Sequence, residues 1–318
     1  MNAKLYPLFD NIKDAHKRIE SFIHRTPVLQ SLLINELYNI EFYFKCENFQ
    51  KVGAFKFRGA TNAVRLLTDA EALKGVTTHS SGNHAAALSL AARQRGIPAY
   101  IVMPENAPQI KKIAVQSYGA QITYCEPTLE AREKTLELVQ QKTGATFIHP
   151  YNNFNVISGQ GTAAVELLDE APFLDAVIAP VGGGGLLSGT AIASKAINSN
   201  IKVYGAEPLN ADDACRSFKK GIIIPSVKPN TIADGLLTSL GAITFEAIRD
   251  NVDDIFTTKE ETIILAMRLV WERMKIIIEP SAAVPLAIVI ENKEFFKNKK
   301  VGIIFSGGNV DLNHLPFY

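Results

Sequence analysis

Short apolar runs alternate with longer amphipathic segments along most of this chain of 318 residues. Near the amino terminus, apolar residues recur at helical spacing from Ile12 to Phe22, and Asp10 is placed to cap the segment. A helix is therefore predicted over 10–22. The stretch 41–46 is short and rich in aromatic side chains, which predicts a strand.

From residue 75 onward, predicted strands and helices alternate. Strands are predicted at 75–79, 99–103, 121–124, 145–148, 176–180, 202–207, 254–258 and 301–305. Helices are predicted at 83–95, 109–116, 129–142, 156–170, 260–274 and 282–291. This order is typical of a doubly wound parallel sheet. Two such series predict an α/β fold with two sheets, and ligands are expected in the turns beyond the carboxyl ends of the strands.

Composition narrows the class of protein. Hydrophobic residues make up 47% of the chain and charged residues 20%, as in ordinary globular proteins. The length of 318 residues is enough for two domains or lobes. The net charge of +1 argues against a nucleic acid or an anionic membrane as partner. The amino terminus lacks the apolar core of a signal peptide, and apolar runs such as 263–270 are too short to span a bilayer. Three widely spaced cysteines argue against a disulfide framework. A cytoplasmic enzyme or binding protein is expected.

The first candidate for chemistry is Lys56, which stands between Phe55 and Phe57 in the segment 53–60. An amine walled by aromatic rings is partly desolvated, which lowers its pKa and lets it form a Schiff base with an aldehyde. Taken alone, the segment fits equally a surface strand with Phe inward and Lys outward.

Two turns between a strand and a helix are candidates for anion binding. Residues 79–84, His-Ser-Ser-Gly-Asn-His, put small hydroxyl groups and backbone N–H groups where a carboxylate could bind, although a plain helix cap would use the same residues. Residues 182–185 are four consecutive glycines, which suit close approach of the backbone to a phosphate. Thr190 stands where a P-loop has lysine, and Leu187 breaks the dinucleotide pattern, so one phosphate monoester is the better match. Tight helix–strand packing is the alternative.

A third turn follows the predicted strand 301–305. Ser306 would direct a hydroxyl group from the strand end toward a ring heteroatom, or would simply cap a short helix. An amine for an aldehyde and a cup for one phosphate are together what pyridoxal 5′-phosphate requires.

At this point the chain resembles a known family, the fold-type II pyridoxal-phosphate enzymes, and within it the group of serine racemases and serine/threonine dehydratases. The matching segments begin at Phe44, Phe55, Ser80, Gly159, Gly182, Ala233, Glu279 and Ser306. The segments 206–213 and 271–275 are similar to serine racemases in particular. The resemblance implies two doubly wound, mostly parallel sheet domains, as in the tryptophan synthase β-like fold. The expected large, cofactor-binding domain is 1–74 plus 147–318, and the small domain is 75–146.

The resemblance also implies a role for each site residue. Lys56 would hold the cofactor and take the α-proton from one face, and Ser81 would be the acid/base on the other face. The cofactor would be bound by Phe55, Lys56, Asn83, Gly182, Gly183, Gly184, Gly185, Leu186, Gly235 and Ser306. The substrate would be bound by Ser80, Ser81, Asn83, His84, Arg132 and Thr238. Histidines other than His84 are expected to be ordinary surface or core residues.

The segment 206–213 resembles the divalent-cation site of serine racemases. Glu207, Asp213 and the carbonyl of Ala211 would supply oxygen ligands suited to Mg²⁺, Mn²⁺ or Ca²⁺, while an acidic solvated loop is the alternative. The match to the ATP site of animal racemases is incomplete. Val52 and Ala86 are apolar where that subgroup is polar, which argues against ATP activation, although Lys51, Tyr118, Lys275 and Asn309 still match.

The expected function is that of a cytoplasmic, homodimeric enzyme acting on serine by racemisation and by α,β-elimination. The alternative within the family is a dehydratase for L-threonine or 3-hydroxyaspartate with little racemase activity. Sequence alone does not decide how the reaction is partitioned. A catalytically silent relative that binds a phosphorylated ligand is a third reading, and the intact Lys56 argues against it.

Overall fold

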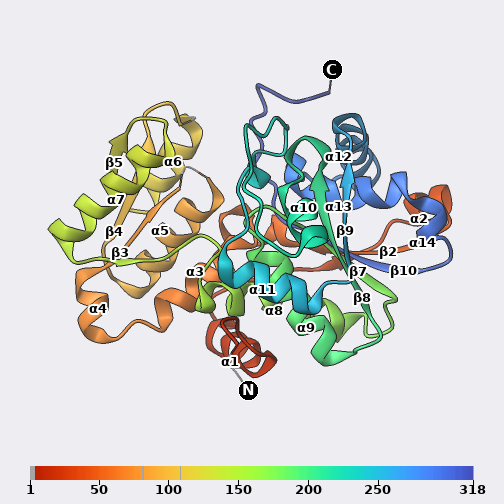
Figure 1. Cartoon of the computed structure of the whole chain (residues 1–318), viewed down its shortest axis with the longest axis horizontal. Coiled ribbons are helices and arrows are strands. Elements are labelled where there is room, and N and C mark those ends of the chain that lie inside the picture. Colours follow the sequence, from red (N-terminus) through yellow and green to blue (C-terminus); the bar gives the residue numbers. More distant parts are fainter. Residues whose placement is uncertain (1–3, 81, 108, 318) are drawn as a thin grey trace.

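The computed structural model describes residues 4–80, 82–107 and 109–317. Figure 1 shows two lobes side by side, a smaller one that holds β3, β4 and β5 and a larger one that holds the remaining long strands. Helix α3 lies between the two lobes.

The strands form two sheets. The large sheet has the order β1-β2-β10-β7-β8-β9, with β1 antiparallel to β2 and all other neighbours parallel. The small sheet is parallel, in the order β5-β4-β3-β6. The strands are β1 Val28–Leu29, β2 Glu41–Cys46, β3 Val76–His79, β4 Ala99–Pro104, β5 Gln121–Cys125, β6 Thr146–Phe147, β7 Ala176–Pro180, β8 Lys202–Pro208, β9 Asp254–Thr258 and β10 Lys300–Phe305. The predicted α/β fold with two mostly parallel sheets is confirmed.

Helices connect nearly all of these strands. They are α1 Phe9–Ile19, α2 Leu32–Tyr38, α3 Lys56–Arg65, α4 Asp69–Lys74, α5 Asn83–Arg95, α6 Gln109–Ser117, α7 Leu129–Thr143, α8 Phe154–Glu170, α9 Gly185–Ile197, α10 Asp213–Lys220, α11 Ala242–Asn251, α12 Glu260–Met274, α13 Pro280–Glu291 and α14 Lys293–Phe296. Short 3-10 turns lie at Glu47–Phe49, Lys51–Gly53, Leu209–Ala211 and Asp234–Leu236. Side-chain caps start several helices, such as Thr128 for α7 and Asn153 for α8.

Most predicted elements agree with the structure within two or three residues, and β2, α5, β7, β9 and α12 agree at both ends. The strand interpretation of residues 53–60 is wrong, because Lys56 begins helix α3. Helices α2, α4, α10, α11 and α14 and strand β1 were not predicted. The division of the chain into 1–74 plus 147–318 and 75–146 stays a prediction, and the small sheet runs from Val76 to Phe147.

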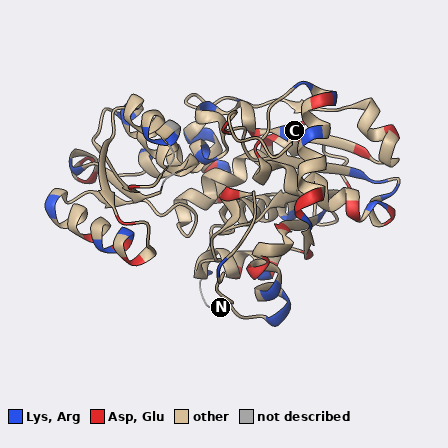
Figure 2. Ribbon diagram, turned by 90° about the horizontal axis from the view of Figure 1, so that it is seen from above, with Lys and Arg blue, Asp and Glu red and all other residues tan. Residues whose placement is uncertain are grey.

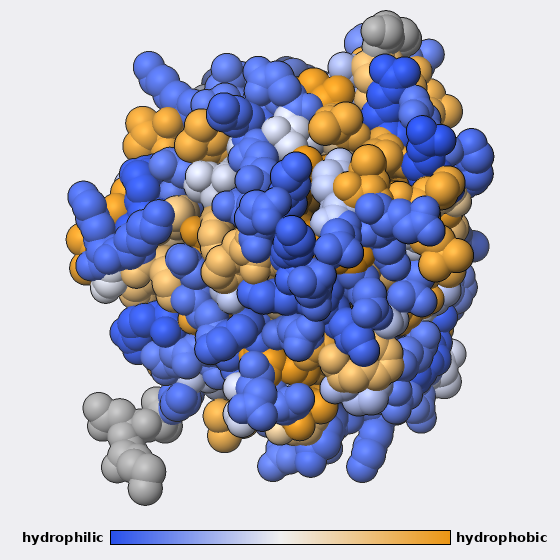
Figure 3. Space-filling view, turned by 90° about the vertical axis from the view of Figure 1, so that its right-hand side faces the viewer, coloured by the Kyte–Doolittle hydropathy of each residue, from blue (hydrophilic) through white to orange (hydrophobic). Residues whose placement is uncertain are grey.

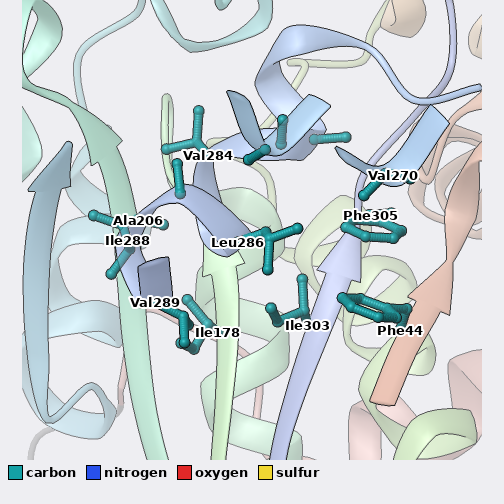
Figure 4. Close-up of a cluster of buried hydrophobic side chains, with 14 of the residues drawn as sticks. Phe44, Ile178, Ala206, Val270, Val284, Leu286, Ile288, Val289, Ile303 and Phe305 are labelled. Carbon is teal, nitrogen blue, oxygen red and sulfur yellow. The ribbon is translucent and has the colours of Figure 1, made fainter. Parts of the chain in front are cut away.

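The core of the large lobe lies on both faces of its sheet. Along β7, Ala176 and Ile178 face α12 and α13, while Val177 and Ala179 face α8 and α9, as expected when side chains alternate along a strand. Figure 4 shows the first of these faces, where Phe44 stacks on Phe305 with ring centroids 4.7 Å apart. A strand buried on both faces explains the uninterrupted apolar runs in the sequence.

Four charged side chains are buried beneath α3, and we call Lys45, Glu47, Arg58 and Glu166 the charge network. Arg58 pairs with Glu47 and with Glu166 at 2.7 Å each, and Lys45 pairs with Glu166 at 2.7 Å. The exposed fraction of each side chain is 2% or less. The network ties the start of α3 to β2 and α8, and so fixes the helix that carries Lys56.

The surface carries both signs of charge. Figure 2 shows Lys and Arg interspersed with Asp and Glu over both lobes, and Figure 3 shows apolar side chains scattered among hydrophilic ones on one face. Among the described residues, helices long and apolar enough to cross a membrane are not found.

Candidate active site

Lys56 lies at the first turn of α3, held there by the strand end of β10. The backbone N–H of Phe55 donates to the carbonyl of Ser306 at 3.0 Å, so the segment before Lys56 is fixed to the large sheet. The Lys56 amine donates to the carbonyl of Pro150 at 2.9 Å, and it lies 5.2 Å from the centroid of the Phe55 ring. Phe57, by contrast, is fully buried in the core of the small lobe.

The electrostatic setting suits amine chemistry. Burial lowers the pKa of Lys56 to about 8, and the nearby carboxylate of Glu279 opposes part of that effect. An amine with this pKa has a substantial neutral fraction near physiological pH and is therefore a nucleophile and a base.

The glycine turn links β7 to α9. Gly184 has φ +88°, and α9 has no side-chain cap at its N-terminus, so its first N–H groups are available to a ligand. A Cβ at Gly183 would lie 2.3 Å from the ring of Tyr151, and one at Gly182 would lie 2.9 Å from the Cα of Leu236. The packing alternative therefore explains part of the glycine run. The uncapped helix start still fits a phosphate, which is bound by such N–H groups.

The serine turn links β3 to α5 in the same way. Ser80 is half-buried and its hydroxyl accepts from the N–H of Gly82 at 3.4 Å. Helix α5 begins after Gly82 and has no side-chain cap, so the described part of the turn does not act as a plain helix cap. Ser81 lies outside the described residues, and its role as acid/base stays a prediction.

Asn83, Glu279 and Asn309 form a hydrogen-bonded bridge between the lobes. The amide of Asn83 donates to the two carboxylate oxygens of Glu279 at 3.0 and 3.2 Å, and the N–H of Asn309 donates to the same carboxylate at 3.1 Å. The side chain of Asn309 also donates to that of Asn83 at 2.9 Å. Burial, together with Asp234, raises the pKa of Glu279 to about 7. Glu279 begins one of the segments that resemble the family, but the sequence did not predict it as a site residue.

The remaining predicted cofactor ligands lie at loop and strand ends. Ser306 is 2% exposed and follows the last residue of β10. The N–H of Gly235 donates to the hydroxyl of Ser281 at 3.0 Å, and the adjacent Leu236 packs on Gly182. The loop that holds Gly235 therefore contacts the glycine turn directly.

The predicted substrate residues His84, Arg132 and Thr238 differ in the burial and hydrogen bonding of their side chains. The imidazole of His84 is 2% exposed and lies 3.0 Å from the carbonyl of Ile148, and burial lowers its pKa to about 3. A neutral ring that donates to a carbonyl has only an acceptor left, so a carboxylate would be bound by the backbone N–H of His84 instead. Arg132 has a buried Nε atom with no partner among the described residues. Thr238 is exposed and lies near the side chain of Tyr151.

The predicted cation ligands are brought together at the end of β8, and we call Glu207 and Asp213 the acidic pair. The carboxylate of Glu207 accepts from the N–H groups of Ala214 and Cys215 at 2.9 and 2.8 Å, while both carboxylate oxygens of Asp213 are buried without a partner in the described part of the chain. Burial raises the pKa of Glu207 to about 9 and that of Asp213 to about 6. Ala211 is buried beside them, at 3% exposure. Buried carboxylate oxygens that lack a hydrogen-bond partner among the described residues fit a hard cation.

The acidic pair supplies only two side chains to the predicted cation site. A cluster of three or more His, Cys, Asp or Glu side chains with metal-binding geometry is not present among the described residues. The full ligand set would therefore require the backbone carbonyl of Ala211 and water, as oxygen-bound Mg²⁺ and Ca²⁺ commonly do.

A cavity of about 450 Å³ opens between the lobes. Val52, Ala86, Tyr118 and Asn309 line it, together with Lys111, which pairs with Asp234 across the opening at 2.7 Å. Val52 and Ala86, the apolar residues that argue against ATP activation, thus line the same cavity as Tyr118 and Asn309, which match the ATP site of animal racemases.

The amine of Lys56, whose pKa is lowered, donates to Pro150, and the next residue, Tyr151, lies against the glycine turn. This arrangement fits enzymes that carry a phosphorylated aldehyde on a lysine. The comparison with protein families agrees. The model described as pyridoxal-phosphate dependent enzyme matches residues 19–307, and the chain belongs to this family.

Relatives and solved structures narrow the comparison. The serine racemase of Dictyostelium discoideum is 55% identical over 96% of this chain and 95% of its own length. The beta-hydroxyaspartate dehydratase of Paracoccus denitrificans is 51% identical over 98% of this chain and 99% of its own length. The crystal structure of the Dictyostelium serine racemase has a TM-score of 0.92 and 54% identity, and covers 96% of this chain and 99% of that one. The resemblance found in the sequence is confirmed.

Proposed function

We propose that this enzyme racemises serine and also eliminates the β-hydroxyl group of serine. The lowered pKa of Lys56 carries the proposal, because a lysine that is partly neutral near physiological pH can both hold an aldehyde and move a proton. The serine racemase relative, which is similar over nearly the whole chain, supports serine as the substrate.

Pyridoxal 5′-phosphate supplies, when bound, the electron sink that acidifies the α-hydrogen of an amino acid. Its phosphate would be held by the N–H groups at the start of α9, and its ring would lie between Phe55, Gly235 and Asn83. The hydroxyl of Ser306 would meet the ring nitrogen. The substrate carboxylate would be bound by the serine turn, at the start of α5.

Racemisation needs a proton carrier on each face of the α-carbon. Lys56 would remove or return the proton on one face, and Ser81 would do so on the other. Elimination removes the α-proton and the β-hydroxyl group together, with water as the leaving product, and the resulting enamine hydrolyses to pyruvate and ammonia. Both reactions share the proton step at Lys56.

A dehydratase for 3-hydroxyaspartate or L-threonine is the second candidate. The similarity to the beta-hydroxyaspartate dehydratase favours it. Arg132 favours it too, because its Nε has no partner among the described residues and its charge lies near His79, at the carboxyl end of β3 where a ligand is expected. A cationic group there would suit a second carboxylate.

We further propose that the acidic pair and the Ala211 carbonyl hold Mg²⁺, Mn²⁺ or Ca²⁺, and that the enzyme is a cytoplasmic homodimer. The buried oxygens of Asp213, which have no partner within the described ranges of the chain, support the cation. The dimer and the location rest on the family resemblance. We propose no activation by ATP, since Val52 and Ala86 offer it no polar partner.

Purified protein supplied with pyridoxal 5′-phosphate should show an absorbance band near the visible edge. Lys56→Ala should abolish that band and the activity, whereas Lys74→Ala, which changes an exposed lysine on α4, should leave both intact. A colourless wild-type protein would contradict the proposal.

Substrate choice is tested with L-serine, L-threonine and 3-hydroxyaspartate, by measuring D-serine and keto acid from each. Fast keto-acid release with no D-serine would favour the dehydratase. Ser81→Ala should suppress racemisation more than elimination of L-serine, because only racemisation needs the second face. Equal losses would count against the assigned role of Ser81.

A further inference from the structure

We infer that His149 is a positioning residue for the amine of Lys56 and for the glycine turn. Its neutral imidazole holds residues 149–152, which we call the histidine turn, in the shape that presents a carbonyl to Lys56. The inference rests on the proposed attachment of the cofactor to Lys56. It assigns a role in the site to a histidine that was expected to be ordinary.

The imidazole of His149 caps its own turn. Its Nδ1 accepts from the N–H of Asn152 at 3.0 Å and from the N–H of Tyr151 at 3.3 Å. A nitrogen that accepts two N–H groups carries no proton, so the proton of the neutral ring is on Nε2. The ring thereby satisfies two backbone donors that a turn otherwise leaves unpaired.

The surroundings keep the imidazole neutral and still. Burial, together with His79 and Lys56 nearby, lowers the pKa of His149 to about 4. The ring centroid of Phe147 lies 5.6 Å from that of His149, and the Tyr151 ring stands nearly perpendicular to the imidazole at 4.6 Å. A protonated ring would lose the acceptor, so the low pKa favours the neutral ring, and the hydrogen bonds to Nδ1 select its tautomer.

Each residue that follows His149 contacts a different part of the site. The carbonyl of Pro150 accepts from the amine of Lys56 at 2.9 Å. The ring of Tyr151 lies against Gly183, where a Cβ would approach it to 2.3 Å. The side chain of Asn152 accepts from the N–H of Ile243 at 2.9 Å, in the first turn of α11.

Helix α11 contacts both the histidine turn and the glycine turn. The hydroxyl of Thr244, one residue beyond Ile243, donates to the carbonyl of Gly183 at 2.8 Å. The histidine turn thus touches the glycine turn directly through Tyr151 and indirectly through α11. A change in its shape would move the Lys56 acceptor and the phosphate cup together.

The Pro150 carbonyl has a particular use in a lysine enzyme. The amine of Lys56 is free whenever it is not bonded to the cofactor, and it must then stay close enough to act as a base and to bond again. A backbone carbonyl at 2.9 Å holds it by one hydrogen bond that breaks at low cost.

The test compares two substitutions of similar size. In His149→Asn the amide oxygen falls near the position of Nδ1 and keeps the acceptor, whereas His149→Gln places its amide near Nε2 and loses it. We expect the dissociation constant for pyridoxal 5′-phosphate to rise about tenfold to a hundredfold in His149→Gln, because two buried donors lose their acceptor. In His149→Asn we expect a change of no more than about threefold.

Equal loss of affinity in the two variants, or no loss in either, would overturn the inference. Circular dichroism melts of the cofactor-free variants check that both fold. If neither folds, ¹⁵N NMR of the imidazole in the unsubstituted, cofactor-free protein decides. A pyridine-like Nδ1 and a protonated Nε2 at neutral pH are expected, and the reverse tautomer would overturn the inference. A wild type that binds no cofactor would instead refute the proposed function, while the NMR result would still stand.

Discussion

The charge network beneath α3 and the acidic pair beside α10 both bury charged side chains almost completely, yet they differ in balance. In the network, two cations face two anions, and Glu166 pairs with both Arg58 and Lys45 at 2.7 Å. Burial alone would raise the pKa of Glu166, but these two cations lower it to about 2. In the acidic pair, burial raises the pKa of Glu207 to about 9.

This difference in charge balance distinguishes the charge network, which is structural, from the acidic pair, which lacks a positive partner. A buried ion network that is neutral as a whole needs nothing more, and it serves to fix the geometry of α3. Two buried carboxyl groups that form no ion pair among the described residues need either protons or a bound positive charge. The comparison therefore supports a bound cation at the acidic pair, and the following experiments would break or sharpen it.

The largest effect is expected from Arg58→Met, which leaves Glu47 and Glu166 buried without their main partner. We expect the free energy of unfolding to fall by about 3–5 kcal/mol, measured by denaturant titration. The matched control is Arg25→Ala, which breaks the exposed 2.6 Å pair with Asp169 and should cost no more than about 1 kcal/mol. Similar losses in both variants would show that burial does not set the importance of these charges.

The second effect concerns the cation. Adding Mg²⁺ or Ca²⁺ to chelator-treated protein should stabilise it by about 2.7 kcal/mol when the ion is at a hundredfold excess over its dissociation constant. The double substitution Glu207→Gln with Asp213→Asn should remove this gain, while Asp212→Asn, at the half-buried neighbour, should keep it. Thermal melts with and without the ion make the measurement. A gain that survives the double substitution would place the cation elsewhere.

The third effect is on pH dependence, where the slope for each group is at most about 1.4 kcal/mol per pH unit and is therefore the smallest change per step. Glu207 and Asp213 have folded pKa values of about 9 and about 6, above their ordinary values of 4.5 and 3.8. The folded, metal-free protein thus binds more protons than the unfolded chain, and its stability should fall as pH rises from about 4 to about 9.

Glu166 behaves in the opposite sense. Its folded pKa of about 2 lies below the ordinary value of 4.5, so its contribution is present above that value and is lost as pH falls toward 2. Melting temperatures across this range, for the wild type and for the double variant at the acidic pair, separate the two. If the stability of the double variant still falls as the pH rises from about 4 to about 9, the acidic pair is not the cause of that fall.

Local patterns in the sequence were sufficient for the order of the elements and for the principal turns. The strand at 176–180, the glycine run 182–185 and the helix that follows are each defined by neighbours within a few residues, because strand and helix periodicity and glycine content are local properties. The segment 53–60 shows the limit of such patterns. Alternating Phe and Lys fitted a strand, but packing against α5 and α8 makes the segment from Lys56 a helix, which separates Phe57 from the amine.

The pairing of groups far apart in the chain was decided only by the tertiary structure. Arg58 meets Glu166, Asn83 meets Glu279, and Lys56 meets Pro150 across at least 94 residues of sequence in each case. Burial, which sets the pKa of Lys56 and of His149, likewise depends on what packs around each group. The sequence alone therefore determined which chemistry the chain carries, and the fold decided which side chains hold that chemistry in place, because desolvation and hydrogen bonding act through space and leave no periodic pattern along the chain.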